Sequence, residues 1–380
     1  MNMKARLGDY IQEYSVKNKK DEDIPVYSVT NTQGFCRDYF GKEVASKDKT
    51  TYKIVPQGCF AYNPSRINVG SVDWQRYEEK VIVSPLYNVF SVSDQLDCQY
   101  LYYYLKSDVA LQRIRAVATG SVRDNLRFEM LSEFPINLPS LNDQRDIVKK
   151  LDGLKNVMKL REEQLAKLDE LIKARFVELF GDPVLNEKGW KTKPLLDMGT
   201  CKNGMNFHYD DSGVEINCLG VGDFKDYSVI ENTDQLPVIS LNDMPPDEYL
   251  LKDEDIVFVR SNGNKSLVGR SVAVYPGNVK TTFSGFCIRY RKHDSEISVP
   301  YLLRVLKTDS IRLKMVGRGA NIQNLNQQIL STLTIPVPPK ELQNLFSNFV
   351  KQVDKSKVAV QKSLDETQLL FDCLMQNCFG

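Results

Sequence analysis

The sequence has few of the residues that build metal centres or disulfide frameworks. It contains only two histidines, His208 and His293, and neither has a second ligand residue at a metal-binding spacing. Its eight cysteines are scattered without a CxxC pair, which is typical of reduced, cytosolic thiols. No apolar run approaches the roughly 18 residues of a membrane span, and no apolar stretch follows the N-terminus. We therefore expect a cytoplasmic protein without a metal site, a signal peptide or a membrane segment.

Complete catalytic motifs are also missing. No GxxxxGK[ST] phosphate loop is present, which argues against ATP-driven translocation by this chain. Leu219–Phe224 resembles a cofactor-binding glycine loop but lacks the third glycine. Asn63–Arg66 resembles the tetrapeptide of adenine methyltransferases but lacks its second proline and its aromatic residue. Glu78–Lys80 resembles half of a metal-nuclease site without a partner aspartate. We expect no catalytic residues and no cofactor bound by this chain, which argues against an enzyme.

The net charge is only +1, but the charges are unevenly distributed. Residues 210–255 contain 13 acidic and two basic residues, whereas residues 260–318 contain 12 basic and three acidic residues. A domain divided in this way can present a basic face that its total charge hides. The alternative is that the two runs pair with each other in the fold.

The two halves of the sequence are related by an internal repeat. Tyr100–Asp108 returns as Tyr301–Asp309, and a shift of 199 residues relates Gly120 to Gly319 and Gln144 to Gln343. This period is far longer than the roughly 20–50 residues of a solenoid repeat, so it indicates a duplicated domain followed by a duplicated helix. Internal pseudo-two-fold symmetry suits a ligand that is itself two-fold, and double-stranded DNA is the commonest such ligand.

We predict an α+β (mixed α/β) fold divided into four segments. Short β-branched and aromatic runs, followed by a helix, indicate globular domains over residues 1–140 and 182–339. Long helices without internal proline are expected over residues 141–181 and 340–380.

Each long helix carries an apolar seam with spacings of three and four residues. In the first helix the seam comprises Leu151, Leu154, Met158, Leu165, Leu168, Ile172 and Leu179. In the second it comprises Val350, Val353, Val360, Leu364, Phe371 and Leu374. Paired antiparallel, helices of this length span roughly 50 Å and would hold the two domains apart, which is the scale of one to one-and-a-half DNA turns. The alternative is a coiled coil that serves only oligomerisation.

Three stretches around the first long helix are distinctive: Leu138–Val148, Arg161–Phe176 and Phe180–Pro183. Together they strongly resemble the conserved region of the specificity subunits of type I restriction–modification systems. In that family "LPxLxEQ" opens the spacer helix and "ARFxELFGDP" closes it. The second copy, Ile335–Gln343, matches more weakly, since Lys340 and Leu342 depart from the pattern. The resemblance covers the whole chain in the order domain, helix, domain, helix.

The resemblance implies a DNA-binding subunit that does no chemistry. Each target recognition domain would read one half of a split DNA sequence, and the paired helices would set the gap between the halves. The helices and their junctions would recruit two adenine-N6 methyltransferase subunits, which bind S-adenosylmethionine, and optionally nuclease/translocase subunits. Because the two domains differ outside their shared frame, we expect an asymmetric target.

Two pairs of loops hold the candidate DNA contacts, because amide and guanidinium groups read base edges and cations bind phosphates. The first pair comprises Arg260, Ser261, Asn262, Asn264, Lys265 and Arg270, with Tyr62, Asn63, Arg66 and Asn68 in the other copy. The second pair comprises Arg123 in one copy and Arg318, Asn321 and Gln323 in the other. The alternatives are plain surface turns and, for Tyr62, a place in the core.

Two other classes of function stay open at this point. One is a two-headed adaptor that binds protein and not DNA. The other is a self-contained methyltransferase or nuclease fragment, which the incomplete catalytic motifs disfavour.

Overall fold

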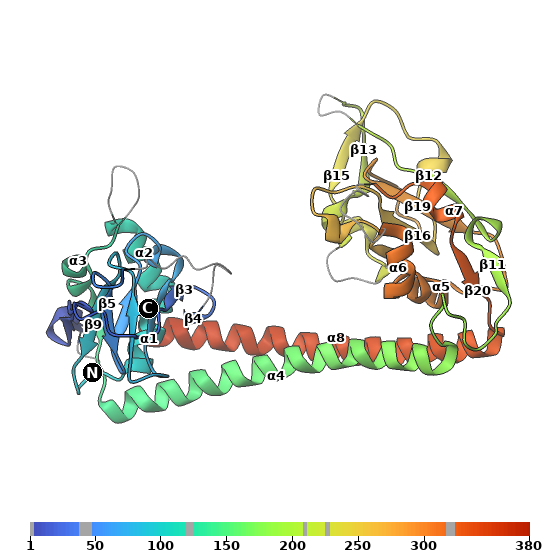
Figure 1. Ribbon diagram of the computed structural model, residues 1–380. Helices are drawn as coiled ribbons and strands as arrows, with labels where there is room; N and C mark the ends of the chain where they lie inside the picture. Colours follow the sequence, from blue (N-terminus) through green and yellow to red (C-terminus); the bar gives the residue numbers. More distant parts are fainter. Residues whose placement is uncertain (1–3, 38–47, 119–124, 208–210, 225–228, 317–323) are drawn as a thin grey trace. The chain divides into compact units, whose positions relative to one another are not determined.

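The structure is a computed structural model that describes residues 4–37, 48–118, 125–207, 211–224, 229–316 and 324–380. The chain forms two compact units. Unit 1 comprises residues 1–164 and 360–380, and unit 2 comprises residues 165–359. Each unit therefore contains one globular domain together with part of both long helices (Figure 1).

Unit 1 is built on an antiparallel sheet of order β2-β9-β6-β7, with the helices α1, α2 and α3 (Figure 1). The smaller sheets β1-β10, β3-β4 and β5-β8 complete it. Its strands are β1 (Lys4–Arg6), β2 (Ile11–Glu13), β3 (Ser28–Thr30), β4 (Gly34–Cys36), β5 (Lys53–Pro56), β6 (Phe60–Tyr62), β7 (Val72–Trp74), β8 (Lys80–Val83), β9 (Asn88–Val92) and β10 (Pro135–Asn137). Its helices are α1 (Cys98–Lys106), α2 (Asp108–Val117) and α3 (Phe128–Ser132).

Unit 2 repeats this plan and extends it. Its main sheet has the order β12-β19-β16-β17-β14, and a second sheet has the order β15-β13-β18. Its strands are β11 (Thr192–Pro194), β12 (Gly199–Asn203), β13 (Val214–Leu219), β14 (Val229–Ile230), β15 (Val238–Leu241), β16 (Asp255–Val259), β17 (Ser271–Val274), β18 (Thr281–Phe283), β19 (Cys287–Lys292) and β20 (Thr334–Pro336). Its helices are α5 (Val299–Leu306), α6 (Asp309–Val316) and α7 (Gln327–Ser331).

The shared frame of the two units is visible in the strand order. The sheet β2-β9-β6-β7 corresponds to β12-β19-β16-β17, and the ladder β1-β10 corresponds to β11-β20. The helices α1, α2 and α3 correspond to α5, α6 and α7 in the same chain order. The predicted mixed α/β class and the internal repeat are therefore confirmed.

The long helices are α4 (Leu141–Phe180) and α8 (Lys340–Phe379), each of 40 residues. In unit 1 the beginning of α4 packs with the end of α8, where Leu151 and Phe379 belong to one core. In unit 2 the end of α4 packs with the beginning of α8, where Phe176 and Phe346 have ring centroids 5.5 Å apart. The helices therefore run antiparallel within each unit. Every residue of the two predicted seams is buried or half-buried.

The beginning of each long helix is fastened by a fully buried glutamine. Gln144 accepts from the Asp97 amide at 2.8 Å and donates to the carbonyls of Gln95 and Pro139. Gln343 makes the same three bonds with the Ser298 amide and the carbonyls of Glu296 and Pro338. Each helix is thereby tied to the start of the first helix, α1 or α5, of the domain that precedes it in the chain.

The end of each long helix packs on the other domain. The rings of Phe379, at the end of α8, and Tyr100 in α1 lie 5.0 Å apart. Phe180, at the end of α4, lies 4.7 Å from Tyr301 in α5. Gly181 then stops α4 with a left-handed φ of +74°, which glycine adopts without a Cβ penalty. Each long helix therefore begins in contact with one domain and ends in contact with the other.

Candidate nucleic-acid interface

The first candidate loop of unit 1 follows β6 and is shaped by its own side chains. Asn63 Oδ1 accepts from the Ser65 amide at 3.1 Å and from Ser65 Oγ at 2.9 Å. Arg66 is exposed, whereas Asn68 is half-buried and its carbonyl accepts from Arg115 Nε of α2. The loop ends at Gly70, whose φ of +86° lies in the left-handed region.

Tyr62 belongs to the core, which is the alternative that the sequence left open. Its side chain is fully buried. Its hydroxyl donates to the Leu126 carbonyl at 3.1 Å and accepts from Asn88 Nδ2 at 2.9 Å. Burial raises the pKa of this phenol well above its usual value. The proposed base contact by the Tyr62 ring is therefore not supported, because the ring is enclosed and its polar end is satisfied.

The equivalent loop of unit 2 follows β16 and has the same construction. Asn262 Oδ1 accepts from the Asn264 amide at 2.7 Å, and Asn264 Oδ1 accepts from the Ser266 amide at 3.1 Å. Arg312 of α6 donates to the carbonyls of Ser266 and Val268, as Arg115 does to its loop in unit 1. The loop closes at a second left-handed glycine, Gly269, with φ +76°.

These turns limit how the asparagines can read a base. Bidentate reading of adenine requires both the amide oxygen and the amide nitrogen of the side chain. Asn63 and Asn264 each accept two hydrogen bonds at Oδ1 within the loop, which occupies both lone pairs, whereas Asn262 accepts one. We therefore expect single donor contacts from Asn63 and Asn264, in place of the predicted bidentate adenine reading.

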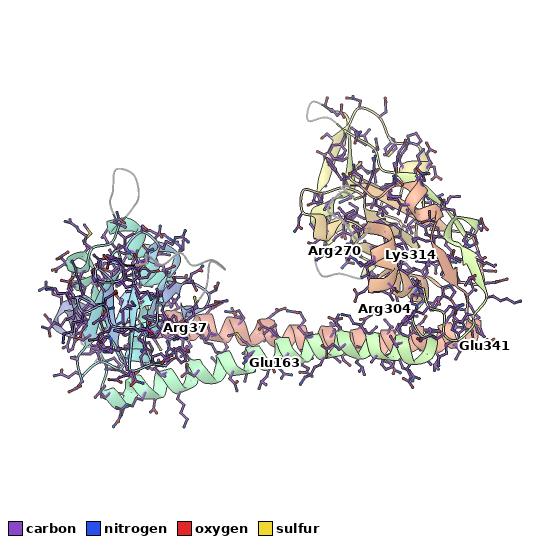
Figure 2. The ribbon with its side chains drawn as sticks, in the orientation of Figure 1. Arg37, Glu163, Arg270, Arg304, Lys314 and Glu341 are labelled. Atoms are coloured by element: carbon purple, nitrogen blue, oxygen red, sulfur yellow. The ribbon has the colours of Figure 1, made fainter. Side chains whose placement is uncertain are left out.

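Arg260 stands at the entrance of the unit 2 loop. It is half-buried, and its Nη1 donates to the Gly285 carbonyl at 3.2 Å. Ser261, also half-buried, forms a β-bridge with Asn324. Arg270 is half-buried at the other end of the loop. Arg270, Arg304 and Lys314 lie in the part of unit 2 that holds α5 and α6 (Figure 2).

The acidic and basic runs of unit 2 pair in part, as the alternative reading of the charges allowed. Asp255 is fully buried and accepts two bonds from Arg291, at 2.8 and 2.7 Å. Arg289 Nη1 lies 4.0 Å from the same carboxylate, and Lys292 pairs with Glu254 at 3.6 Å. The three cationic side chains already interact with carboxylates of the same domain, so they are poor candidates for DNA contacts.

Two lysines at equivalent helix ends were not among the predicted contacts. Lys106 ends α1, and its Nζ donates to the carbonyls of Gly70 and Asn31. Burial lowers the pKa of Lys106 to about 8, and burial with the nearby Arg304 and Lys357 lowers that of Lys307 to about 8. Both lysines lie in the repeated segment of the sequence, so the repeat could have identified them as equivalent residues. Lys106 brings an amine to the carbonyl of the glycine that closes the first loop.

Several predicted residues lie outside the described residues. They are Arg123, Arg318, Asn321 and Gln323 of the second loop pair, His208, and the side chain of Lys265. On the C-terminal side of the second loop pair, the described residues begin with Asn125-Leu126 and Asn324-Leu325. The Leu126 amide donates to the Pro64 carbonyl at 3.1 Å, and the Leu325 amide donates to the Arg260 carbonyl at 2.8 Å.

Residues of two of the incomplete catalytic motifs have structural partners. Asp223 Oδ2 accepts from the Gly220 amide at 2.8 Å within the glycine loop, and Glu78 pairs with Arg37 at 3.7 Å. Each of the eight cysteines is a free thiol.

In the described part of the chain, no group of three or more His, Cys, Asp or Glu side chains could hold a metal ion. No described helix has the length and apolarity required to cross a bilayer.

Comparison with known proteins covers nearly the whole chain. The family model for the type I restriction modification DNA specificity domain matches residues 7–170 and again residues 187–367. The chain is 22% identical to the type I restriction enzyme StySPI specificity subunit of Salmonella potsdam, over 97% of this chain and 83% of that protein. It is 23% identical to the MjaVIII specificity subunit of Methanocaldococcus jannaschii, over 92% of this chain and 85% of that protein.

Solved structures agree at the level of the fold. A chain from a structure on complex assembly and conformational transition of the type I R-M system superposes with a TM-score of 0.63, at 16% identity, covering 99% of this chain and 97% of that chain. The S subunit from M. genitalium superposes with a TM-score of 0.53 at 16% identity, covering 100% and 96%. With two matches of the family model, one in each repeat, the chain belongs to the type I restriction–modification DNA specificity family.

Proposed function

We propose that this chain reads an asymmetric, two-part DNA target, with one half-site for each globular domain, as a cytoplasmic subunit of a methyltransferase or restriction complex. The observation that carries the proposal is the duplicated loop construction. In both units an Asn-based turn follows the same strand, ends at a left-handed glycine, and is held by an arginine from the second helix. The loops keep this frame but differ in side chains, which suits half-sites of different sequence.

The proposed division of the chain follows the helices. Residues 1–140 and 182–339 are the two recognition domains, and residues 141–181 and 340–380 are the spacers between half-site readers. Support comes from α4 and α8, which are unbroken over 40 residues and continue from one unit into the other. A continuous helix transmits a fixed separation, whereas a flexible linker does not.

We further propose that the chain is non-catalytic and recruits two adenine-N6 methyltransferase subunits, with nuclease/translocase subunits as optional partners. S-adenosylmethionine would then bind to the methyltransferase subunits. The docking surface would be the outer faces of the helices, which carry apolar residues in solvent outside the seam. They are Val157, Leu160, Leu171 and Val177 on α4, and Leu345, Val358, Leu369 and Leu370 on α8. Docking of a subunit on these faces would remove the apolar groups from water, which is favourable.

DNA binding by the complex with its methyltransferase subunits tests this function against a protein-only adaptor. We expect affinity to fall steeply with salt, because phosphate contacts release counterions. Arg66→Ala should reduce the slope of log K against log salt by about 1 if its guanidinium contacts a phosphate. Binding that is independent of salt, or absent, would favour the adaptor.

The matched control is Arg6→Ala in the same unit. Arg6 is exposed like Arg66, but it forms an ion pair with Glu133 and lies outside the candidate loops. We expect Arg6→Ala to leave the salt slope unchanged. Equal effects of the two substitutions would show that Arg66 acts only through the overall charge.

A further inference from the structure

A large apolar side chain is exposed at the same turn of both units. Leu86 is 75% exposed and Phe286 is 61% exposed. Leu86 is the third residue of the turn Ser84–Tyr87, where the Tyr87 amide donates to the Ser84 carbonyl at 3.1 Å. Phe286 is the third residue of the turn Ser284–Cys287, where the Cys287 amide donates to the Ser284 carbonyl at 2.8 Å. Single exposed apolar residues are common on proteins, but their recurrence at equivalent turns requires a reason.

In unit 2 this turn lies directly beside the candidate loop. The β16–β19 register places Val259 opposite Cys287, so Arg260 comes opposite Phe286. The amides of Arg260 and Ser261 both donate to the Phe286 carbonyl, at 2.7 and 3.3 Å. The exposed ring therefore belongs to a residue bonded to the first two residues of the loop.

Unit 1 has the same juxtaposition. The β6–β9 register places Tyr62 opposite Asn88, and two further steps bring Pro64 opposite Leu86. Proline has no amide proton, so the bond that Arg260 makes in unit 2 has no counterpart here. The carbonyls of Pro64 and Arg260 instead receive the amides of Leu126 and Leu325, which follow the second candidate loops. In each unit, then, the exposed residue, the first loop and the exit of the second loop meet at one point.

The turn in unit 2 is held rigidly, so exposure of the ring does not come from a loose segment. The Phe286 amide donates to Ser284 Oγ at 3.2 Å, and Arg260 Nη1 donates to the Gly285 carbonyl at 3.2 Å. A Cβ atom at position 285 would lie 2.0 Å from Asn206 Oδ1, so the glycine permits this close packing. A fixed turn that displays an apolar group among polar side chains has the composition of a base-reading surface.

We propose that Phe286 and Leu86 are specificity-determining residues, each packing against the thymine methyl group of one base pair in its half-site. The inference rests on the proposed function. The methyl group of thymine is the one apolar feature that a base pair presents in the major groove, and phenylalanine is among the residues that contact it. Neighbouring polar groups, such as Arg260 beside Phe286, supply the hydrogen bonds that a methyl contact cannot.

The experiment measures binding of the complex with its methyltransferase subunits to its target, with each thymine replaced in turn by deoxyuridine. This replacement removes only the methyl group. We expect the wild-type complex to lose about fourfold in affinity at one position of the half-site read by unit 2. Phe286→Ser should abolish the sensitivity at that position, whereas Phe286→Leu should retain it. Leu86→Ser should act in the same way on the other half-site.

Val238→Ser is the matched control, because Val238 is also exposed and apolar but lies in β15, away from the turn. It should keep the wild-type sensitivity to deoxyuridine. The inference is overturned if no thymine position is sensitive, if Phe286→Ser keeps the sensitivity, or if it weakens only assembly with the methyltransferase subunits. A wild-type complex that binds no specific two-part sequence would instead defeat the proposed function itself.

Discussion

Replacement of Gln343 by alanine is expected to lower the free energy of unfolding of unit 2 by about 2–4 kcal/mol. The side chain is fully buried and satisfies the Ser298 amide and the carbonyls of Glu296 and Pro338. Alanine leaves all three groups without this partner, and a buried group without a partner costs about 1–3 kcal/mol. Gln144→Ala should destabilise unit 1 for the same reason, since its three bonds are equivalent.

Chemical denaturation followed by tryptophan fluorescence measures this loss. The sequence has two tryptophans, one in each unit, so Trp74→Phe makes Trp190 the reporter of unit 2. Gln352→Ala, on the exposed side of the same helix, is the control and should change stability by less than about 0.5 kcal/mol. Equal stability of the Gln343→Ala and Gln352→Ala variants would contradict the role assigned to the buried amide.

Insertion of one heptad into each long helix is expected to replace the recognised DNA sequence by one with the same half-sites and a longer gap. The insertions belong after Gln164 and after Ala359, where both helices leave one unit and enter the other. Asp169 of α4 and Lys357 of α8 pair at 2.7 Å, so these points lie at a similar level of the helix pair. Seven residues keep the apolar seam in phase.

The seven added residues lengthen each helix by about 10 Å, which corresponds to about three base pairs. Methylation mapping in cells that carry the extended chain reads out the new gap directly. An insertion in α4 alone serves as the control, because it puts the two seams out of step and should abolish methylation. A chain with both insertions that keeps the parental gap would show that the helices do not set the spacing.

The duplication and the helices were predictable from sequence because both depend on local pattern. The spacing of Leu151, Ile172 and Val353 indicates a seam without any knowledge of the partner helix. The sequence also showed that Gln144 and Gln343 occupy equivalent positions of the repeat. It did not show why both positions hold glutamine. Two of the three hydrogen bonds of each glutamine reach residues 45 to 49 positions away, which no periodicity encodes.

The candidate contacts were less predictable because burial decides them. Tyr62 and Arg66 lie four residues apart, yet the tyrosine is enclosed and the arginine is exposed. Asparagine is a residue type that reads bases, but the side-chain oxygens of Asn63 and Asn264 accept hydrogen bonds within the turn itself. Phe286 and Leu86 share no sequence motif, and only the strand register shows that they occupy equivalent places.

Methylation mapping of the host genome, with the gene intact and with the gene deleted, tests the central claim most directly. The account predicts that deletion removes one asymmetric N6-methyladenine motif, made of two different half-sites and a gap of fixed length. Restoring the gene should restore the motif. An unchanged set of methylated motifs, at a locus whose methyltransferase is expressed and active, would contradict a role for this chain in choosing the DNA target.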